Sequence, residues 1–195
     1  MNFSGSYFLE NTKEKVWELI NNPKVLMNCI DGCKEFTEIE KNKFFLKVLV
    51  KIGPINANFS GTLLIKDINE PQSYIIEASG SAGQLGGASG NVFIKLSSKE
   101  SQTCLYYDAS TKINGKIAQL GSRLIEGAVK KNTTSFFKNF ESYSKNKTTN
   151  NTVSVSKRNI IASNYNPNKL LDKKYIYSIS IVFLIVFIII IISNE

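Results

Sequence analysis

The segment KFFLKVLVKIGPINANFSGTLLIKDI, residues 43–68, decides the fold class of this 195-residue chain. Apolar and polar side chains alternate along both of its halves. The positions that carry the alternation are Phe45, Val48, Val50 and Ile52, then Phe59, Gly61, Leu63 and Ile65. A period of two is typical of a strand with one buried face, and Gly53-Pro54 between the halves favours a turn. The segment therefore predicts an antiparallel hairpin.

Strand signals continue on both sides of this hairpin. We predict strands over residues 33–40, 43–52, 56–68, 73–80, 90–98 and 103–113, with one more over residues 3–9. Two short helices are predicted before residue 33. The first follows Asn11-Thr12-Lys13-Glu14, which resembles a capping box, and the second has Asn22 as N-cap and Pro23 at its first position.

A long helix is predicted over residues 116–143, because apolar side chains recur there near a 3.6-residue period. Together these elements predict an α+β fold of the helix-grip type. In it, a curved antiparallel sheet of about seven strands wraps a long C-terminal helix. This domain is expected to occupy residues 1–144.

Residues 175–192 form a run of eighteen residues without a charge, YIYSISIVFLIVFIIIII. An eighteen-residue helix is about 27 Å long, close to the hydrocarbon thickness of a bilayer. Lys169, Lys173 and Lys174 precede the run, and basic residues favour the cytoplasmic side. The sequence thus predicts a single-pass tail anchor in the cell membrane, with the N-terminal domain cytoplasmic.

The charge of the chain is unevenly distributed. Residues 1–144 carry 17 basic and 14 acidic side chains, whereas residues 145–174 carry 7 and 1. We interpret residues 145–174 as a flexible basic linker. A flexible chain of about 28 residues has a root-mean-square span of roughly 30 Å. Since a domain that binds nucleic acid needs a basic stripe interleaved with aromatic residues, the sequence does not favour nucleic-acid binding.

The sequence offers no clear set of metal ligands or catalytic groups. There is no histidine, and Cys29 and Cys33 have no second pair to complete a zinc site. Glu77, Asp108 and Glu126 show no paired spacing. We therefore predict no metal, no cofactor and no enzymatic activity.

The glycine-rich segment from Gly80 to Gly90, GSAGQLGGASG, does not precede a helix with Lys-Ser or Lys-Thr, so it is no phosphate loop. Two interpretations stay open: a mobile hairpin whose Leu85 covers a pocket mouth, or a plain flexible turn. Trp17 is interpreted as a core residue, with the rim of a cavity as the alternative. Arg123 could bind a polar ligand head, a partner carboxylate or solvent.

A pocket is expected where a curved sheet faces one helix, because core side chains need not fill the concave side. Small residues at positions such as Ala57, Gly61, Ala78, Gly121 and Ala128 would enlarge it. The alternative is that they only permit close packing.

Several motifs resemble those of the carbon monoxide dehydrogenase G-subunit family, within the START-like helix-grip superfamily. The resemblance covers nearly all of residues 1–144. Its motifs are Val16-Trp17, Cys29-Ile30-Asp31-Gly32-Cys33, KIGPINA at residues 51–57 with Phe59 and Gly61, and GKIAQLGSRLI at residues 115–125. The family pattern places proline where Asp31 stands.

The resemblance implies partners and a ligand site. The implied partners are the membrane, a molybdenum hydroxylase of the carbon monoxide dehydrogenase type, and an apolar small molecule such as a quinone or lipid. The expected ligand-binding residues are Phe59, Gly61, Leu63, Leu85, Phe93, Leu120, Gly121, Leu124, Ile125 and Phe136.

Three functions remain open from the sequence. The first is a membrane-tethered carrier that binds a quinone or lipid and couples the dehydrogenase to the membrane. The second is a surface adaptor that recruits the enzyme without ligand transfer. The third is a small enzyme of the cyclase or dehydratase kind.

Overall fold

The predicted hairpin forms the centre of the structure, a computed structural model that describes residues 1–149. Strand β3 (Lys43–Ile52) pairs antiparallel with β4 (Ile55–Asn69) across the Gly53-Pro54 turn. In β3 the inward side chains are those of Phe44, Leu46, Val48, Val50 and Ile52, all buried. The prediction that Phe45 shares this face was wrong: positions 44 and 45 are both Phe, and the period of two puts Phe44 in the core.

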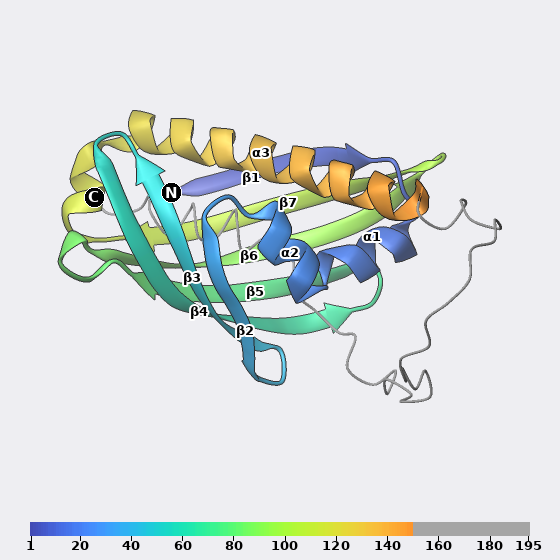
Figure 1. Ribbon diagram of the computed structural model, residues 1–195, viewed down its shortest axis with the longest axis horizontal. Coiled ribbons are helices and arrows are strands. Elements are labelled where there is room, and N and C mark those ends of the chain that lie inside the picture. The colour runs from blue at the N-terminus through green and yellow to red at the C-terminus, as the bar shows by residue number, and fades with distance from the viewer. Residues whose placement is uncertain (150–195) are drawn as a thin grey trace, which may run out of the picture.

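Seven strands form one antiparallel sheet in the order β1-β7-β6-β5-β4-β3-β2 (Figure 1). All seven predicted strands are confirmed. The observed bounds of the others are β1 Asn2–Leu9, β2 Cys33–Glu40, β5 Ser73–Ser81, β6 Gly87–Lys99 and β7 Gln102–Ile113. Because consecutive strands β2 to β7 are neighbours, the β3–β4 and β5–β6 connections lie at one end of the sheet, and the β4–β5 and β6–β7 turns lie at the other.

The two short helices join β1 to β2 and begin where the caps predict. Thr12 accepts a hydrogen bond from the Lys15 amide at the start of α1 (Lys13–Ile20). Asn22 accepts from the Lys24 amide at the start of α2 (Pro23–Cys29), with Pro23 in the first turn. These caps satisfy amides that the first helical turn leaves without partners.

The long helix α3 (Ser122–Thr149) crosses one face of the sheet (Figure 1). The predicted helix over 116–143 was misplaced at its start, since residues Gly115–Leu120 form a separate 3₁₀ helix, η2. Gly121 between them has a φ of 78°, which an α-helix cannot contain. The apolar period continues through both helices, so periodicity alone does not reveal the break.

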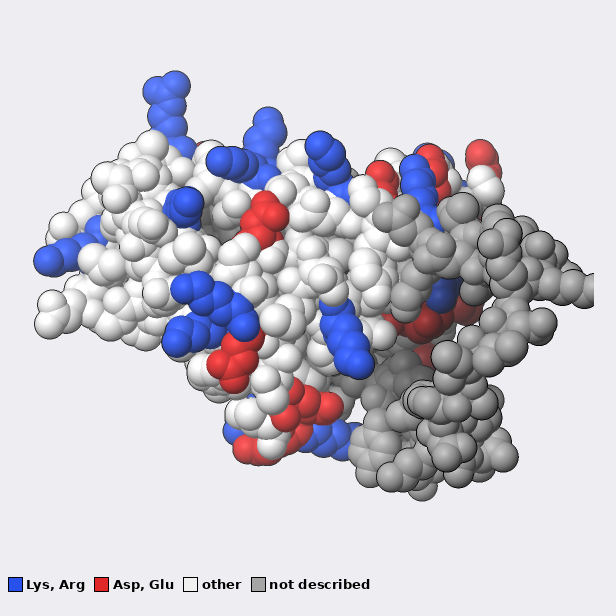
Figure 2. Space-filling view, viewed as in Figure 1, with Lys and Arg blue, Asp and Glu red and all other residues white. Residues whose placement is uncertain are grey.

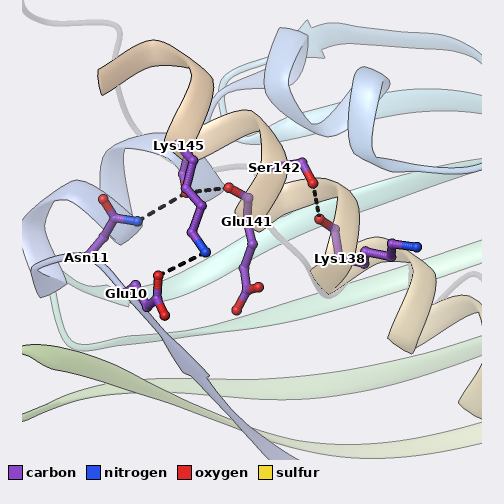
Figure 3. A network of polar contacts seen from close by, with 7 residues as sticks. Glu10, Asn11, Lys138, Glu141, Ser142 and Lys145 are labelled. Atoms are coloured by element: carbon purple, nitrogen blue, oxygen red, sulfur yellow. Dashed lines mark hydrogen bonds and ion pairs between the residues drawn. The ribbon is translucent and has the colours of Figure 1, made fainter. Parts of the chain in front are cut away.

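The C-terminal half of α3 is fastened to the end of β1, as Figure 3 shows. Lys145 Nζ lies 2.9 Å from a carboxylate oxygen of Glu10, and the Asn11 side-chain amide donates to Ser144 Oγ at 3.2 Å. The Glu10 carboxylate raises the pKa of Lys145 through its hydrogen bond and its charge. Nearby, Tyr7 of β1 stacks on Phe137 of α3 with ring centroids 3.5 Å apart.

A second fastening joins α3 to the junction between α2 and β2. Asn139 donates to the Cys29 carbonyl at 3.1 Å and to the Asp31 carboxylate at 3.2 Å, and Ser135 donates to the same carboxylate. A proline at position 31 would offer no such acceptor. The Asp31 carboxylate therefore holds the α2–β2 junction against α3.

The predicted tail anchor, residues 175–192, lies outside the described residues, as does the predicted linker beyond Thr149. Between residues 1 and 149, none of the helices has the length and apolar character needed to cross a membrane.

Candidate functional site

The candidate site is the interior between α3 and the inner face of the sheet. Four of the predicted ligand-binding residues, Phe59, Leu63, Ile125 and Phe136, are buried there in one hydrophobic cluster. Leu85 and Leu120 are half-buried and pack against the same cluster. The structure thus brings six of the ten predicted residues together, two of them at the end of the interior where α3 begins.

Two predicted residues, Phe93 and Leu124, are not part of this buried cluster. Phe93 is 39% exposed on the outer face of the sheet, because its neighbours Val92 and Ile94 take the inward positions of β6. It therefore cannot line a cavity between sheet and helix, and its inclusion was wrong. Leu124 is 50% exposed, and its side chain lies against the β3–β4 turn, 3.5 Å from where a Cβ on Gly53 would stand.

The two predicted glycines have backbone roles. A Cβ on Gly61 would lie 2.3 Å from the Ser79 carbonyl oxygen, so glycine permits the close approach of β4 and β5. Gly121 has open space around it and breaks the helix through its positive φ. For Gly61 the packing interpretation raised from the sequence is the one that the geometry favours.

Three buried polar side chains, those of Trp17 on α1, Asn21 at its C-cap and Thr133 on α3, also belong to the core of the domain. Trp17 is 3% exposed, which confirms it as a core residue, and its ring meets that of Tyr74 edge-on at 5.3 Å. Within the described residues, Trp17 Nε1, Asn21 Oδ1 and Thr133 Oγ1 have no hydrogen-bond partner although they are buried. Sequence reasoning missed Asn21 and Thr133, since only the fold shows that they are buried.

The glycine-rich segment from Gly80 to Gly90 lies mostly within two strands. Gly80 belongs to β5 and Gly90 to β6, so only residues 82–86 connect the strands, with a short 3₁₀ helix, η1 (Gly83–Leu85), among them. The Asn114 side chain accepts from the Gly87 amide at 2.7 Å. This bond ties the connection to the residues just before η2.

The backbone of the β5–β6 connection also packs closely against residues 114–115. A Cβ on Gly86 would lie 2.0 Å from the Asn114 carbonyl oxygen, and one on Gly115 would lie 2.5 Å from Gly86 Cα. Both glycines have positive φ angles, 111° and 79°. The β5–β6 connection and the start of η2 are therefore packed backbone to backbone, beside half-buried Leu85 and Leu120.

The outer face of the sheet carries a shallow groove of about 510 Å³. Short polar side chains form its floor because outward positions of neighbouring strands are in register: Thr62 with Ser79, Ser79 with Ser89, and Asn91 with Ser110. A smaller hollow of about 380 Å³ adjoins it near Phe45. The groove lies on the far side of the sheet from α3, so it is separate from the interior.

The carboxylates considered for catalysis do not meet in the interior. Glu77 is on the outer face and forms an ion pair with Lys66. Asp108 is on the outer face of β7, paired in register with Phe93, and Glu126 is exposed on α3. This arrangement brings no acid and base together at a common substrate position.

Burial makes two of the cysteines poor nucleophiles. Desolvation raises the pKa of Cys29 to about 12 and that of Cys33 to about 11. A thiol with a pKa of 12 is ionised to about one part in ten thousand at pH 8, and the thiolate is the reactive form.

We expect maleimide at pH 8 to label half-buried Cys104 first and to label Cys29 only after denaturation. Mass spectrometry of tryptic peptides after timed labelling measures this, and equal rates for Cys29 and Cys104 would contradict it.

A family model that describes the G subunit of carbon monoxide dehydrogenase (CoxG) matches residues 5–144. A search of curated proteins found none that matches the chain. Among solved structures, a conserved protein from Geobacillus kaustophilus is 28% identical with a TM-score of 0.71, covering 75% of this chain and 96% of its own.

More distant structures share the fold. A START superfamily protein from Mycobacterium smegmatis has a TM-score of 0.59 at 8% identity, over 74% of this chain and 97% of its own. The protein Ara h 8.0201 has a TM-score of 0.57 at 17% identity, over 75% and 98%. The antiparallel seven-stranded sheet with its C-terminal helix is therefore a START-like fold.

Proposed function

The chain belongs to the CoxG family of carbon monoxide dehydrogenase G subunits, and from this premise we propose that it is a membrane-tethered carrier of a quinone or lipid that couples a molybdenum hydroxylase to the membrane. Membership of this family and the START-like fold support a role in binding a hydrophobic ligand. The family name also implies an association with carbon monoxide dehydrogenase.

The observation that carries the proposal is an incompletely covered apolar rim at one end of a buried interior. Leu85 and Leu120 are half-buried at this end, and Leu124 is half exposed. They adjoin the break at Gly121, around which there is open space. Since exposed apolar surface is costly in water, an apolar ligand that covers the rim while entering the interior would be stabilised there.

The buried polar atoms suit a ligand with oxygen acceptors. Trp17 Nε1 can only donate a hydrogen bond, and the Thr133 hydroxyl can donate one. Buried polar groups without partners are uncommon, so a ligand carbonyl that accepts from either would remove a desolvation cost. A quinone combines such carbonyl oxygens with an apolar ring and tail.

Tethering supports the carrier function because a quinone is nearly insoluble in water. The sequence places an uncharged run at residues 175–192, following a segment with 7 basic and 1 acidic residues. A carrier held within reach of the bilayer would shorten the aqueous path of its ligand. The hydroxylase would then receive or return electrons through the carried quinone.

Trp17 provides a direct test, because it is the only tryptophan in the chain and is buried in the hydrophobic core that the ligand would enter. We expect a short-chain quinone to quench Trp17 fluorescence of the full-length protein in detergent, in a saturable manner. We also expect a stoichiometric quinone or lipid in organic extracts of the protein purified from a quinone-containing host. An empty protein with no saturable quenching would refute ligand carriage and leave the adaptor function.

A matched pair of variants separates specific recognition from nonspecific partition. Thr133→Val removes a buried hydroxyl and keeps the side-chain shape, and we expect the quinone to bind about fivefold more weakly, as for one lost hydrogen bond of about 1 kcal/mol. Thr134→Val changes an exposed position one residue away and should leave binding unchanged. Equal quinone affinity in both variants would exclude Thr133 as a ligand contact.

A further inference from the structure

We infer that one end of the folded domain, formed by residues 50–58, 80–90 and 111–131, docks directly on an anionic lipid surface. We call it the basic end. Contacts bring its three segments together, because Leu124 lies against Gly53 and Gly86 packs on residues 114–115. The inference concerns the domain's own surface and does not require the proposed ligand or the predicted tail anchor.

The first argument is the distribution of charge. The basic end contains six basic residues and one acidic residue, a net charge of +5, whereas the rest of residues 1–144 carries 11 basic and 13 acidic residues, a net charge of −2. The six are Lys51, Lys112, Lys116, Arg123, Lys130 and Lys131, all exposed. Figure 2 shows Lys and Arg but no Asp or Glu at its left-hand end, where this part of the fold lies in Figure 1.

These cations are also free of ion pairs. The four salt bridges between described residues use Lys15, Lys43, Lys66 and Lys145, none of which belongs to the basic end. Like charges in one region repel one another, and within the basic end only Glu126 offsets them. An anionic surface would neutralise the rest.

The second argument is the apolar tip among these cations. Leu124 is 50% exposed, more than any other large hydrophobic side chain in residues 1–145, and Pro54 is exposed beside half-buried Ile55. An apolar tip ringed by cations suits the boundary between lipid headgroups and acyl chains. None of the three segments contains an aromatic residue, so the surface lacks the stacking groups typical of nucleic-acid binding.

Docking by this end would place the rim of the interior on the bilayer. Leu85, Leu120 and Leu124 belong to both the rim and the basic end. The 28 residues of α3 extend about 42 Å toward the opposite end. The 25 residues between Thr149 and the uncharged run at 175–192 can extend to about 85 Å, so chain length permits this orientation.

The experiment measures which end of the full-length protein contacts lipid. The three native cysteines are replaced by alanine, with folding checked by circular dichroism, and a fluorophore is attached through Ser122→Cys at the basic end. The matched control carries it through Ser101→Cys in the β6–β7 turn at the opposite end of the sheet. Vesicles contain an acyl-chain nitroxide quencher and either phosphatidylcholine alone or phosphatidylcholine with phosphatidylserine.

We expect strong quenching of the Ser122 label only in the phosphatidylserine vesicles, and its loss in about 1 M salt, where charges are screened beyond about 3 Å. Each basic residue near an anionic surface strengthens binding about fivefold, so Lys116→Gln with Arg123→Gln should lower the docking constant about 25-fold. The charge-matched control, Lys24→Gln with Lys95→Gln, should change it less than about fivefold.

Quenching of the Ser122 label that is equal in neutral vesicles would overturn the inference, as would equal quenching at Ser101 or none at either position. Protection of the Ser122 label by an acidic protein but not by anionic lipid would assign the basic end to a protein partner instead. A protein that binds no quinone would still give each of these quenching results. Lipid docking by the basic end and the proposed carrier function are therefore tested independently.

Discussion

Phe136→Ala is expected to lower the free energy of unfolding by about 3–5 kcal/mol, the usual cost of removing a fully buried phenyl ring. Phe136 is 1% exposed and its ring lies 5.9 Å from that of Phe140 and 5.5 Å from that of Phe137. The truncation would leave a void between α3 and the sheet. For a domain of this size the melting temperature should fall by about 10 °C or more, as measured by circular dichroism.

Phe93→Ala is the matched control, because it makes the same chemical change on the opposite face of the sheet. Phe93 is 39% exposed, so its truncation should cost less than about 1 kcal/mol. Equal losses in the two variants would mean that Phe93 is buried, contrary to the observed register of β6. A negligible loss for Phe136→Ala would mean that α3 does not close the core.

Gly86→Ala is expected to destabilise the protein by about 3 kcal/mol. Its φ of 111° is unfavourable for a residue with a Cβ. The new methyl group would also stand 2.0 Å from the Asn114 carbonyl oxygen, so the β5–β6 connection must move away from the start of η2. Amide hydrogen exchange should rise at Gly87 and Asn114, whose hydrogen bonds to each other would be lost.

Gly83 lies in the same β5–β6 connection, and Gly83→Ala separates the cost of a positive φ from the cost of a steric clash. Gly83 has a φ of 61°, but no atom lies within 4 Å of its added Cβ. Only the cost of the left-handed conformation applies, about 1 kcal/mol, and exchange at Asn114 should not change. If both variants lost the same stability, the contact between Gly86 and Asn114 would not hold this end together.

The two ends of α3 are held differently, and this difference bears on ligand entry. The C-terminal half is held by the ion pair between Glu10 and Lys145 and by the hydrogen bonds that Ser135 and Asn139 donate to the Asp31 carboxylate. The N-terminal end follows a glycine break and presents Leu124 to solvent. An opening movement would therefore cost least where α3 begins, which is also where the apolar rim lies.

The sequence by itself determined the α+β class, all seven strands and the caps at Thr12 and Asn22, because these depend on interactions between residues close in the chain. Alternating side chains specify a strand with one buried face, and Asn22-Pro23 specifies a helix start. The family motifs also lie in short contiguous segments. They were sufficient to indicate the family that the match over residues 5–144 shows.

Only the tertiary structure decided which face each residue occupies where the local pattern is ambiguous. Val92, Phe93 and Ile94 are adjacent and all apolar. The sheet places Val92 and Ile94 in the core and Phe93 on the outer face. The burial of Thr133 and the packing of Gly86 on residues 114–115 join segments distant in the chain, so no local pattern encodes them.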